Sequence, residues 1–286
     1  MRFIRKLFFF CVFVSLAWVG IYAYNRVTDG FSVRQMTSSL PACPHYEVAL
    51  SPEKKACLQA MLDQSFRYIG KGCQFYVFAS ADDKFVIKFL KHKHLRPFSW
   101  LNALPMTAKL RTLSDAKIER RKQRVERLFA SCKLAYEKMP EETGLMFIHL
   151  NRTPALEKQI VLVDKLGCKH AVDIDDYEYV IQKKAIPVRD VFAHLEEGEI
   201  LGKVQLLVDL VLGRCQKGIC DRDRSFVQNV AFSAEEDKAL FIDIGQFYED
   251  PAILQDEEQA KDLTKRLGNL RFWTEKHFPQ LAPHIP

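Results

Sequence analysis

Apolar residues form one unbroken run near the start of the chain, at residues 7–24 (LFFFCVFVSLAWVGIYAY). The run carries no charge, and its length is near the lower limit of the roughly 17–25 residues that a membrane-spanning helix needs. A cleaved signal peptide is the alternative, but the apolar core of a signal peptide is usually shorter, and no clear A-x-A cleavage site follows this run. We therefore predict an uncleaved, single-pass membrane anchor. The side of the membrane stays open because basic residues flank the run on both sides, namely Arg2, Arg5 and Lys6 before it and Arg26 and Arg34 after it.

Apolar residues at helical spacing predict three further helices. The first has Ser51 as its N-cap and Pro52 at its first position. The second covers residues 114–138, and its exposed side is rich in Lys and Arg. The third covers residues 200–215 and is apolar enough to be buried.

Shorter runs of β-branched and aromatic residues predict strands. Two of them, 76–79 and 85–90, flank the turn sequence ADDK and predict a hairpin. Further strands are predicted at 145–150, 159–165 and 177–182, and a second hairpin at VAFS, AEED and KALFID, residues 230–243. Strands and helices in this order predict an α+β fold.

Composition limits the class of protein. A hydrophobic content of 48% and a charged content of 27% are typical of a globular protein with a substantial core. The net charge of +6 suits an anionic substrate or a membrane surface, but a small excess is more often a solvated surface. No nucleic-acid partner is predicted. The basic segment 91–94 (KHKH) is interpreted as solvated, with an anion- or lipid-facing patch as the alternative.

The eight cysteines are scattered along the chain. They form no CxxC pair and have no histidine at zinc-site spacing. Without Cys11, which lies in the apolar run, an odd number remains. We therefore predict reduced thiols rather than a disulfide framework.

Residues 217–247 carry a pattern of polar residues that is typical of metal and phosphate chemistry. Asp223 and Asn229 lie in a polar loop, and Asp243 follows the second strand of the predicted hairpin. Mg²⁺ prefers oxygen ligands and usually keeps substrate phosphates in its shell, so Asn229 and Asp243 are candidate metal ligands. Asp223 is available to orient an attacking hydroxyl group. Because a buried charge is costly, a metal or Lys88 is expected to compensate Asp243.

This stretch resembles two segments of the protein-kinase-like superfamily. GICDRDRSFVQNV is similar to the catalytic loop GIVHRDLKPENV, and FIDIGQF is similar to the metal-binding DFG segment. Asp221 replaces the histidine of the family, and we interpret it as a surface ion-pair or turn residue. The interval from Asp223 to Asn229 is one residue longer than in the family, which we interpret as a bulged loop.

Upstream, residues 66–90 resemble the glycine-rich loop and the lysine strand of the same superfamily. The resemblance implies that Gly70, Gly72 and Val77 contact a nucleotide and that Lys88 binds its α- and β-phosphates. Phe75 stands where the third glycine belongs.

The resemblance also implies a helix glutamate that pairs with Lys88. Glu126 and Glu119 are both available in the predicted helix 114–138 and lie on one face of it. Glu126 is closer to the middle of the helix, so we favour it.

The resemblance implies a two-lobed fold with a truncated C-terminal lobe, because no APE segment follows. The N-terminal lobe should contain an antiparallel sheet. The expected organisation is a membrane anchor (1–24), a linker (25–50), an N-terminal lobe with a leading helix (51–184) and a C-terminal lobe (185–286). Small-molecule and lipopolysaccharide-core sugar kinases share this shortened form.

Three functional hypotheses follow from these observations. The first is a membrane-anchored phosphotransferase that uses ATP and Mg²⁺ to phosphorylate an unidentified hydroxyl acceptor on a sugar, a lipid-linked sugar or a protein. The second is a pseudokinase that acts as a membrane-tethered binding or scaffolding module. The third is a membrane-tethered domain unrelated to kinases.

Overall fold

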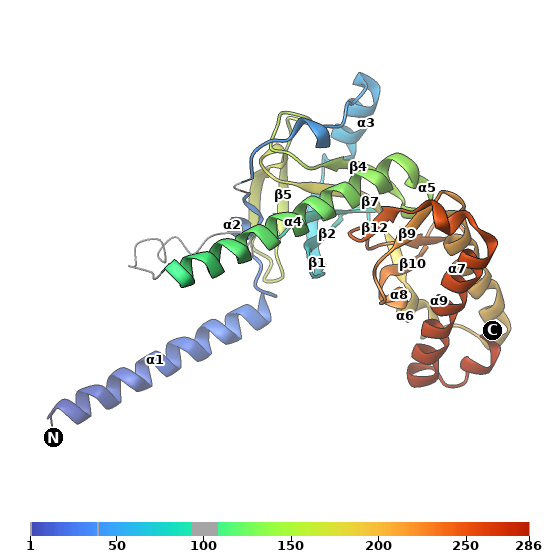
Figure 1. The fold of residues 1–286 in the computed structure, drawn as a ribbon. Helices are drawn as coiled ribbons and strands as arrows, with labels where there is room; N and C mark the ends of the chain where they lie inside the picture. The colour runs from blue at the N-terminus through green and yellow to red at the C-terminus, as the bar shows by residue number, and fades with distance from the viewer. Residues whose placement is uncertain (1, 39, 93–107, 286) are drawn as a thin grey trace.

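The computed structural model describes residues 2–38, 40–92 and 108–285, and it is a mixture of helices and strands (Figure 1). The helices are α1 (Arg2–Val27), α2 (Val33–Met36), α3 (Pro52–Met61), α4 (Ala108–Lys138), α5 (Pro140–Thr143), α6 (Val188–Phe192), α7 (Ile200–Gln216), α8 (Phe226–Asn229) and α9 (Asp256–His277). The strands are β1 (Ser65–Lys71), β2 (Phe75–Ser80), β3 (Phe85–Leu90), β4 (Leu145–His149), β5 (Gln159–Val163), β6 (Lys169–Asp173), β7 (Tyr179–Lys183), β8 (Ala185–Pro187), β9 (Ile219–Asp221), β10 (Val230–Ser233), β11 (Ala239–Phe241) and β12 (Phe247–Glu249).

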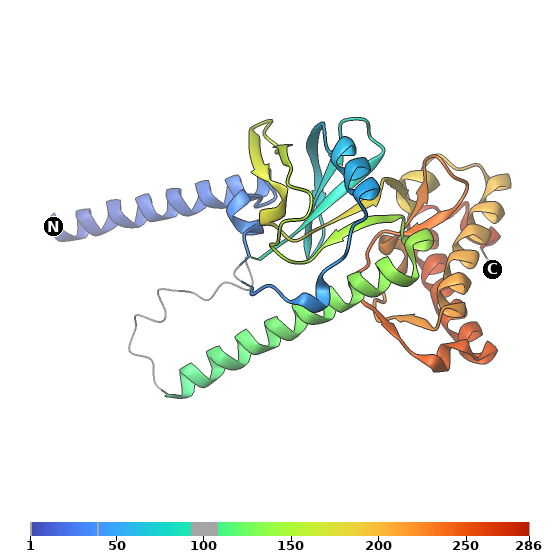
Figure 2. The ribbon, with the colours of Figure 1, turned by 90° about the horizontal axis from the view of Figure 1, so that it is seen from above.

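Helix α1 projects away from the rest of the molecule (Figures 1 and 2). Its segment Phe8–Val27 is long and apolar enough to cross a membrane, and none of it is buried against the protein. A signal sequence has the same properties. The apolar run at residues 7–24 therefore forms part of one helix that stands apart, as its composition predicts.

The chain packs against the sheet immediately after α1. Phe31 and Met36 are buried in the same hydrophobic cluster as the sheet residue Tyr76, and the Tyr76 hydroxyl donates a hydrogen bond of 2.8 Å to the carbonyl of Gly30. The interpretation of residues 25–50 as a linker therefore needs correction. The segment is polar overall, so its composition did not indicate that Phe31 and Met36 anchor it to the sheet.

A seven-stranded sheet has the strand order β4-β7-β3-β2-β1-β5-β6. Both strands of the first predicted hairpin are confirmed and pair as β2 and β3. The sheet is mixed rather than antiparallel, because β1 and β5 run parallel. Strand β6 was not predicted, since only one of its five side chains, Val172, is buried.

Helix α4 lies across one face of this sheet and extends beyond it (Figure 2). It includes the predicted helix 114–138 and begins earlier. Its buried residues Val125, Leu128 and Cys132 belong to a hydrophobic cluster that continues into the C-terminal part of the chain. The helix thus connects the sheet with residues 185–285.

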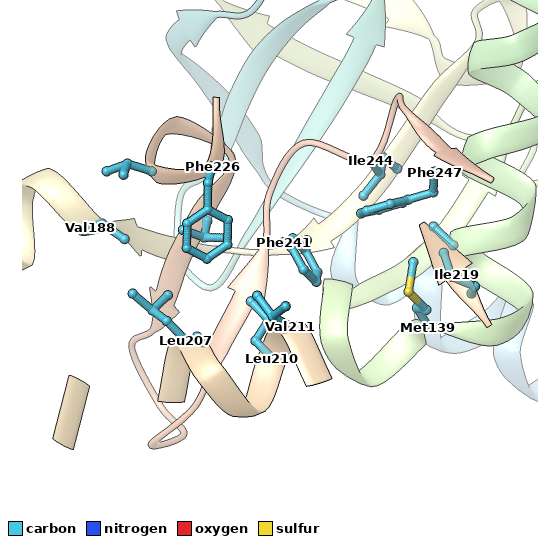
Figure 3. Packing of buried hydrophobic residues seen from close by; sticks show 14 of the residues in the cluster. Met139, Val188, Leu207, Leu210, Val211, Ile219, Phe226, Phe241, Ile244 and Phe247 are labelled. Atoms are coloured by element: carbon cyan, nitrogen blue, oxygen red, sulfur yellow. The ribbon is translucent and has the colours of Figure 1, made fainter. Parts of the chain in front are cut away.

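Residues 185–285 contain α7 and α9 together with two small sheets, β11-β10-β8 and β12-β9. Figure 3 shows that Phe226, Phe241, Ile244 and Phe247 lie in the cluster that also contains Leu207 of α7. These four residues flank the polar side chains of the candidate site in sequence. Their burial fixes the backbone of both segments that carry the site.

His92 contradicts the interpretation of residues 91–94 as solvated. Its side chain is buried, and Nε2 lies 2.8 Å from Oε2 of the buried Glu178. The backbone N–H of His92 also donates to Gln35, so this end of β3 is tied to the segment after α1. Lys93 and His94 lie outside the described residues.

Candidate functional site

The strand register places three candidate residues in one row across the sheet. Gly70 pairs with Val77, Val77 with Lys88, and Lys88 with Val180. Side chains of directly paired residues point to the same face of a sheet. Gly70, Val77 and Lys88 therefore share the face that α4 covers.

The glycine-rich segment is a tight turn between β1 and β2. The N–H of Gly72 donates to the carbonyl of Phe75 at 3.0 Å, which leaves Cys73 and Gln74 at the tip. Phe75 is buried as the first residue of β2. Phe75, at the position where the resemblance would place a third glycine, therefore anchors the turn in the hydrophobic core.

Lys88 connects the sheet to the segment that carries Asp243. Its Nζ donates a hydrogen bond of 2.5 Å to the carbonyl of Ile242. Burial lowers the pKa of the Lys88 ammonium from 10.5 to about 8, although the negative charge of Asp243 acts in the opposite direction. Lys88 is therefore close to Asp243, and burial of its positive charge costs free energy.

This burial predicts a pH dependence of stability. The pKa of Lys88 is 10.5 in the unfolded chain and about 8 in the folded protein, so the unfolded chain binds more protons between these values. The unfolding free energy should rise with pH there, and Lys88 should contribute up to about 3 kcal/mol to the rise.

Urea denaturation of wild type and Lys88→Met at several pH values measures this contribution. Between pH 8 and 10.5, we expect the wild-type unfolding free energy to increase relative to that of the variant. Comparison with the variant cancels the titration of other groups, such as the buried tyrosines. A difference that stays constant across the window would show that the ammonium is well solvated.

Asp223 lies in the loop between β9 and α8. Partial burial alone would raise the pKa of its carboxyl, but hydrogen bonds from the backbone N–H of Ser225 and from the side chain of Asn229 lower it. The Ser225 N–H lies 2.8 Å from Oδ1. The net shift is downward, so Asp223 is ionised at neutral pH.

Asn229 joins the two polar segments of the site. Its carbonyl accepts hydrogen bonds from the N–H groups of Ile242 (2.8 Å) and Asp243 (3.4 Å), and the residue is buried. The additional residue between Asp223 and Asn229 does not form a bulge. It is accommodated by the single helical turn α8, whose Phe226 is buried in the core.

Asp243 is exposed to the cleft, which corrects the expectation that its charge is buried. Its Oδ1 accepts a hydrogen bond of 3.1 Å from the N–H of Gly245. The next residues are fixed by Ser131 of α4, whose hydroxyl donates to the carbonyl of Ile244 (2.5 Å) and accepts from the N–H of Phe247 (2.7 Å). Sequence reasoning missed Ser131 because a lone serine in a helix carries no distinctive signal.

Neither glutamate proposed for Lys88 reaches it. Glu119 and Glu126 are both exposed, and no ion pair to Lys88 occurs among the described residues. With 3.6 residues per turn, both glutamates lie roughly opposite Leu128, which faces the cleft. The prediction that Glu126 pairs with Lys88 is therefore wrong. Helical periodicity places Glu126 opposite the apolar stripe that contains Leu128, and this signal is present in the sequence.

Asp221 is a buried ion-pair residue and not a surface one. Its carboxylate lies 3.1 Å from Nη1 of Arg266 in α9, and both side chains are almost fully buried. Arg266 also donates to the carbonyls of Asp221 (2.9 Å) and Asp223 (3.0 Å). Burial raises the pKa of Asp221, although Arg266 acts to lower it. The loop that carries Asp223 is thus held by a residue more than 40 positions away.

A cleft of about 850 Å³ brings these segments together. Asp223 and Asp243 both line it, together with Cys73 and Gln74 from the glycine-rich turn. The other lining residues are Leu90, Lys91, Lys117, Arg120, Arg121, Arg124, Val125, Leu128 and Gln246. The structure therefore unites two carboxylates and the glycine-rich turn, while Glu126 stays outside.

Comparisons with known proteins give remote likenesses only. No protein-family profile matches the chain, and no curated protein sequence matches it. Among solved structures, the chain is similar to WbdD, a bifunctional kinase-methyltransferase, with a TM-score of 0.36 and 14% identity over 67% of this chain and 34% of WbdD. It is also similar to Rv3197 of Mycobacterium tuberculosis, solved with erythromycin, with a TM-score of 0.36 and 14% identity over 80% of this chain and 59% of Rv3197.

The chain thus spans about a third of the length of WbdD and 59% of that of Rv3197. Likenesses with TM-scores of 0.36 carry no argument about function. The functional argument therefore rests on the strand register, the contacts of Lys88 and the cleft.

Proposed function

We propose that this protein is a membrane-anchored, two-lobed kinase-like phosphotransferase that uses Mg-ATP to phosphorylate a hydroxyl acceptor. The observation that carries the proposal is the hydrogen bond of Lys88 to Ile242. It brings a strand lysine next to Asp243, whose carboxylate lines the same cleft as Asp223. Lys88 and Ile242 are far apart in the sequence, so the tertiary fold produces this proximity.

The residues that line the cleft and those next to them in the chain fit a magnesium nucleotide. A Cβ added to Gly70 or Gly72 would meet nothing within 4 Å, so the backbone there is accessible to phosphate oxygens. Mg²⁺ is usually held by one or two protein oxygen ligands plus phosphates and waters. Asp243 and Asn229 suit this role. A preassembled cluster of three or more His, Cys, Asp or Glu side chains is absent from the described part of the chain.

Asp223 has the charge that the reaction needs. In phosphoryl transfer, the acceptor oxygen forms a bond to the γ-phosphorus while the bond from that phosphorus to the departing ADP oxygen breaks. The ionised Asp223 accepts a hydrogen bond from the acceptor hydroxyl, orients it and receives its proton. Lys88 contributes a fixed positive charge toward the nucleotide phosphates.

Helix α1 serves as the anchor in this proposal. Only a few residues separate its end at Val27 from the buried Phe31. The catalytic domain is therefore held close to the bilayer, where a lipid-borne acceptor is within reach.

A pseudokinase is the second candidate, and one observation favours it. Lys88 lacks a glutamate partner among the described residues and bonds to a backbone carbonyl instead. A site in this form could bind nucleotide without turning it over. Measurement of both binding and transfer separates the two candidates.

Asp243→Asn tests the proposed metal site. The two side chains have nearly the same size, so the fold should be retained while Mg²⁺ loses a charged ligand. In wild type, ATP should raise the melting temperature more with Mg²⁺ than without it. In the variant this dependence on Mg²⁺ should disappear.

Asp237→Asn is the matched control, because Asp237 is highly exposed in the turn of the β10–β11 hairpin. It should preserve the dependence on Mg²⁺. Wild-type protein that binds no nucleotide at millimolar concentration, with Mg²⁺ or Mn²⁺ or without metal, would reject both nucleotide-dependent candidates.

A further inference from the structure

The cleft contains a row of basic side chains that the proposed reaction does not use. Lys117, Arg120, Arg121 and Arg124 of α4 all line it. They are spaced three and four residues apart and therefore share one side of the helix. We call these four residues the basic face of α4. Leu128 continues the same side farther into the cleft.

The charges around this face are unbalanced. Five basic side chains line the cleft, the four of the basic face and Lys91, against the two carboxylates of Asp223 and Asp243. The acidic residues in this half of α4, Asp115, Glu119 and Glu126, are exposed and lie roughly on the other side of the helix. Within the described ranges, no ion pair joins the basic face to a carboxylate.

A solvated helix surface usually has a different pattern. Like charges three and four residues apart destabilise a helix, and exposed helices usually mix the two signs along a face. In this half of α4 the acidic side chains all lie away from the cleft, whereas the four residues of the basic face line it with no acidic residue among them. This separation concentrates positive potential at the site where an acceptor must bind.

The basic face also exceeds what the nucleotide requires. Lys88 already supplies a positive charge beside Asp243. The distance along the helix from Lys117 to Arg124 is about 10 Å at 1.5 Å per residue. An anionic group bound there can lie well apart from the hydroxyl that Asp223 orients.

We propose that the basic face of α4 binds a phosphate group carried by the acceptor, so the acceptor class is a hydroxyl compound that already bears phosphate. Arg120, Arg121 and Arg124 suit this role because guanidinium groups form paired hydrogen bonds with phosphate oxygens. This inference rests on the proposed phosphotransferase function and specifies its substrate class.

The phosphate could belong to a membrane lipid headgroup or to a soluble compound. In both Figure 1 and Figure 2, the start of α4 and helix α1 project from the same side of the molecule. If α1 spans a bilayer, the basic face lies toward that membrane, where an anionic headgroup would be attracted to it. The experiment therefore tests both sources.

The experiment uses the full-length protein in phosphatidylcholine nanodiscs, saturated with Mg²⁺ and a non-hydrolysable ATP analogue. Inorganic pyrophosphate is titrated and its binding is followed by calorimetry. Arg121→Gln combined with Arg124→Gln should weaken pyrophosphate binding by at least about tenfold, because charge-assisted hydrogen bonds are lost. Its affinity for the ATP analogue should stay unchanged.

The matched control combines Arg111→Gln with Lys122→Gln, which removes the same charge from exposed positions outside the cleft lining. This variant should bind pyrophosphate like wild type. Equal weakening in both double variants, or equal loss of nucleotide affinity in the first, would overturn the proposal. If wild type binds no nucleotide, the proposed function fails, and the same titration without nucleotide still tests the basic face.

Nanodiscs that also contain phosphatidic acid distinguish the two sources. A lipid headgroup on the basic face would compete with pyrophosphate, so wild-type affinity should fall in these discs while that of the Arg121 and Arg124 double variant does not. An unchanged wild-type affinity would assign the site to a soluble phosphorylated acceptor. Either result supports a phosphate site.

Discussion

Replacing Asp223 with asparagine is expected to slow phosphate transfer by about 10²–10⁴-fold while leaving nucleotide affinity nearly unchanged. The carboxylate is kept ionised by the N–H of Ser225 and the side chain of Asn229. An asparagine oxygen can still accept the Ser225 hydrogen bond, so the loop should keep its conformation. The variant lacks only the negative charge that orients the acceptor hydroxyl and receives its proton.

ADP release at saturating ATP, in the presence of candidate acceptors, measures this effect, and thermal shift measures nucleotide binding. The matched control is Asp209→Asn on α7, an exposed aspartate that accepts a hydrogen bond from Gln205. It should retain full activity. A pseudokinase would show no transfer in wild type, and an Asp223→Asn protein as active as wild type would remove Asp223 from the mechanism.

Arg266→Met is expected to lower the unfolding free energy by about 3–5 kcal/mol, because it leaves the buried Asp221 carboxylate without its partner. Arg266 Nη1 lies 3.1 Å from this carboxylate. The variant also loses the two hydrogen bonds that Arg266 donates to the loop carbonyls of Asp221 and Asp223. The loop should then be less ordered, so activity should fall even where the protein remains folded.

Urea denaturation provides the free energies for this prediction. Arg271→Met is the control on the same helix, because Arg271 pairs with Glu275 at an exposed position and should contribute less than about 1 kcal/mol. Combining Arg266→Met with Asp221→Leu should recover part of the loss, since the unpaired charge is then removed. A loss for Arg266→Met no larger than that of the control would mean that water reaches Asp221.

Local patterns in the sequence determined most of the elements that hold the site. The β2–β3 hairpin, α7 and the β10–β11 hairpin were predictable because each depends on apolar periodicity and turn residues within a short stretch. The helix start at Ser51 was also predictable, since its side chain accepts a hydrogen bond from the N–H of Lys54. The order of Lys88, Asp223, Asn229 and Asp243 predicted a shared site, and two of these residues, Asp223 and Asp243, line the cleft.

Only the tertiary structure decided which side chains reach one another. The place of Glu126 along α4 favours it as the partner of Lys88, but its direction around the helix axis depends on how Leu128 and Cys132 pack, and it points away from Lys88. Asp221 could not be recognised as buried, because its partner Arg266 comes from a distant helix. The basic side of α4 was visible in the sequence as a charge-rich surface, and its direction toward the cleft depended on the same packing. Short-range periodicity thus fixed the elements, while long-range burial and charge pairing fixed the site.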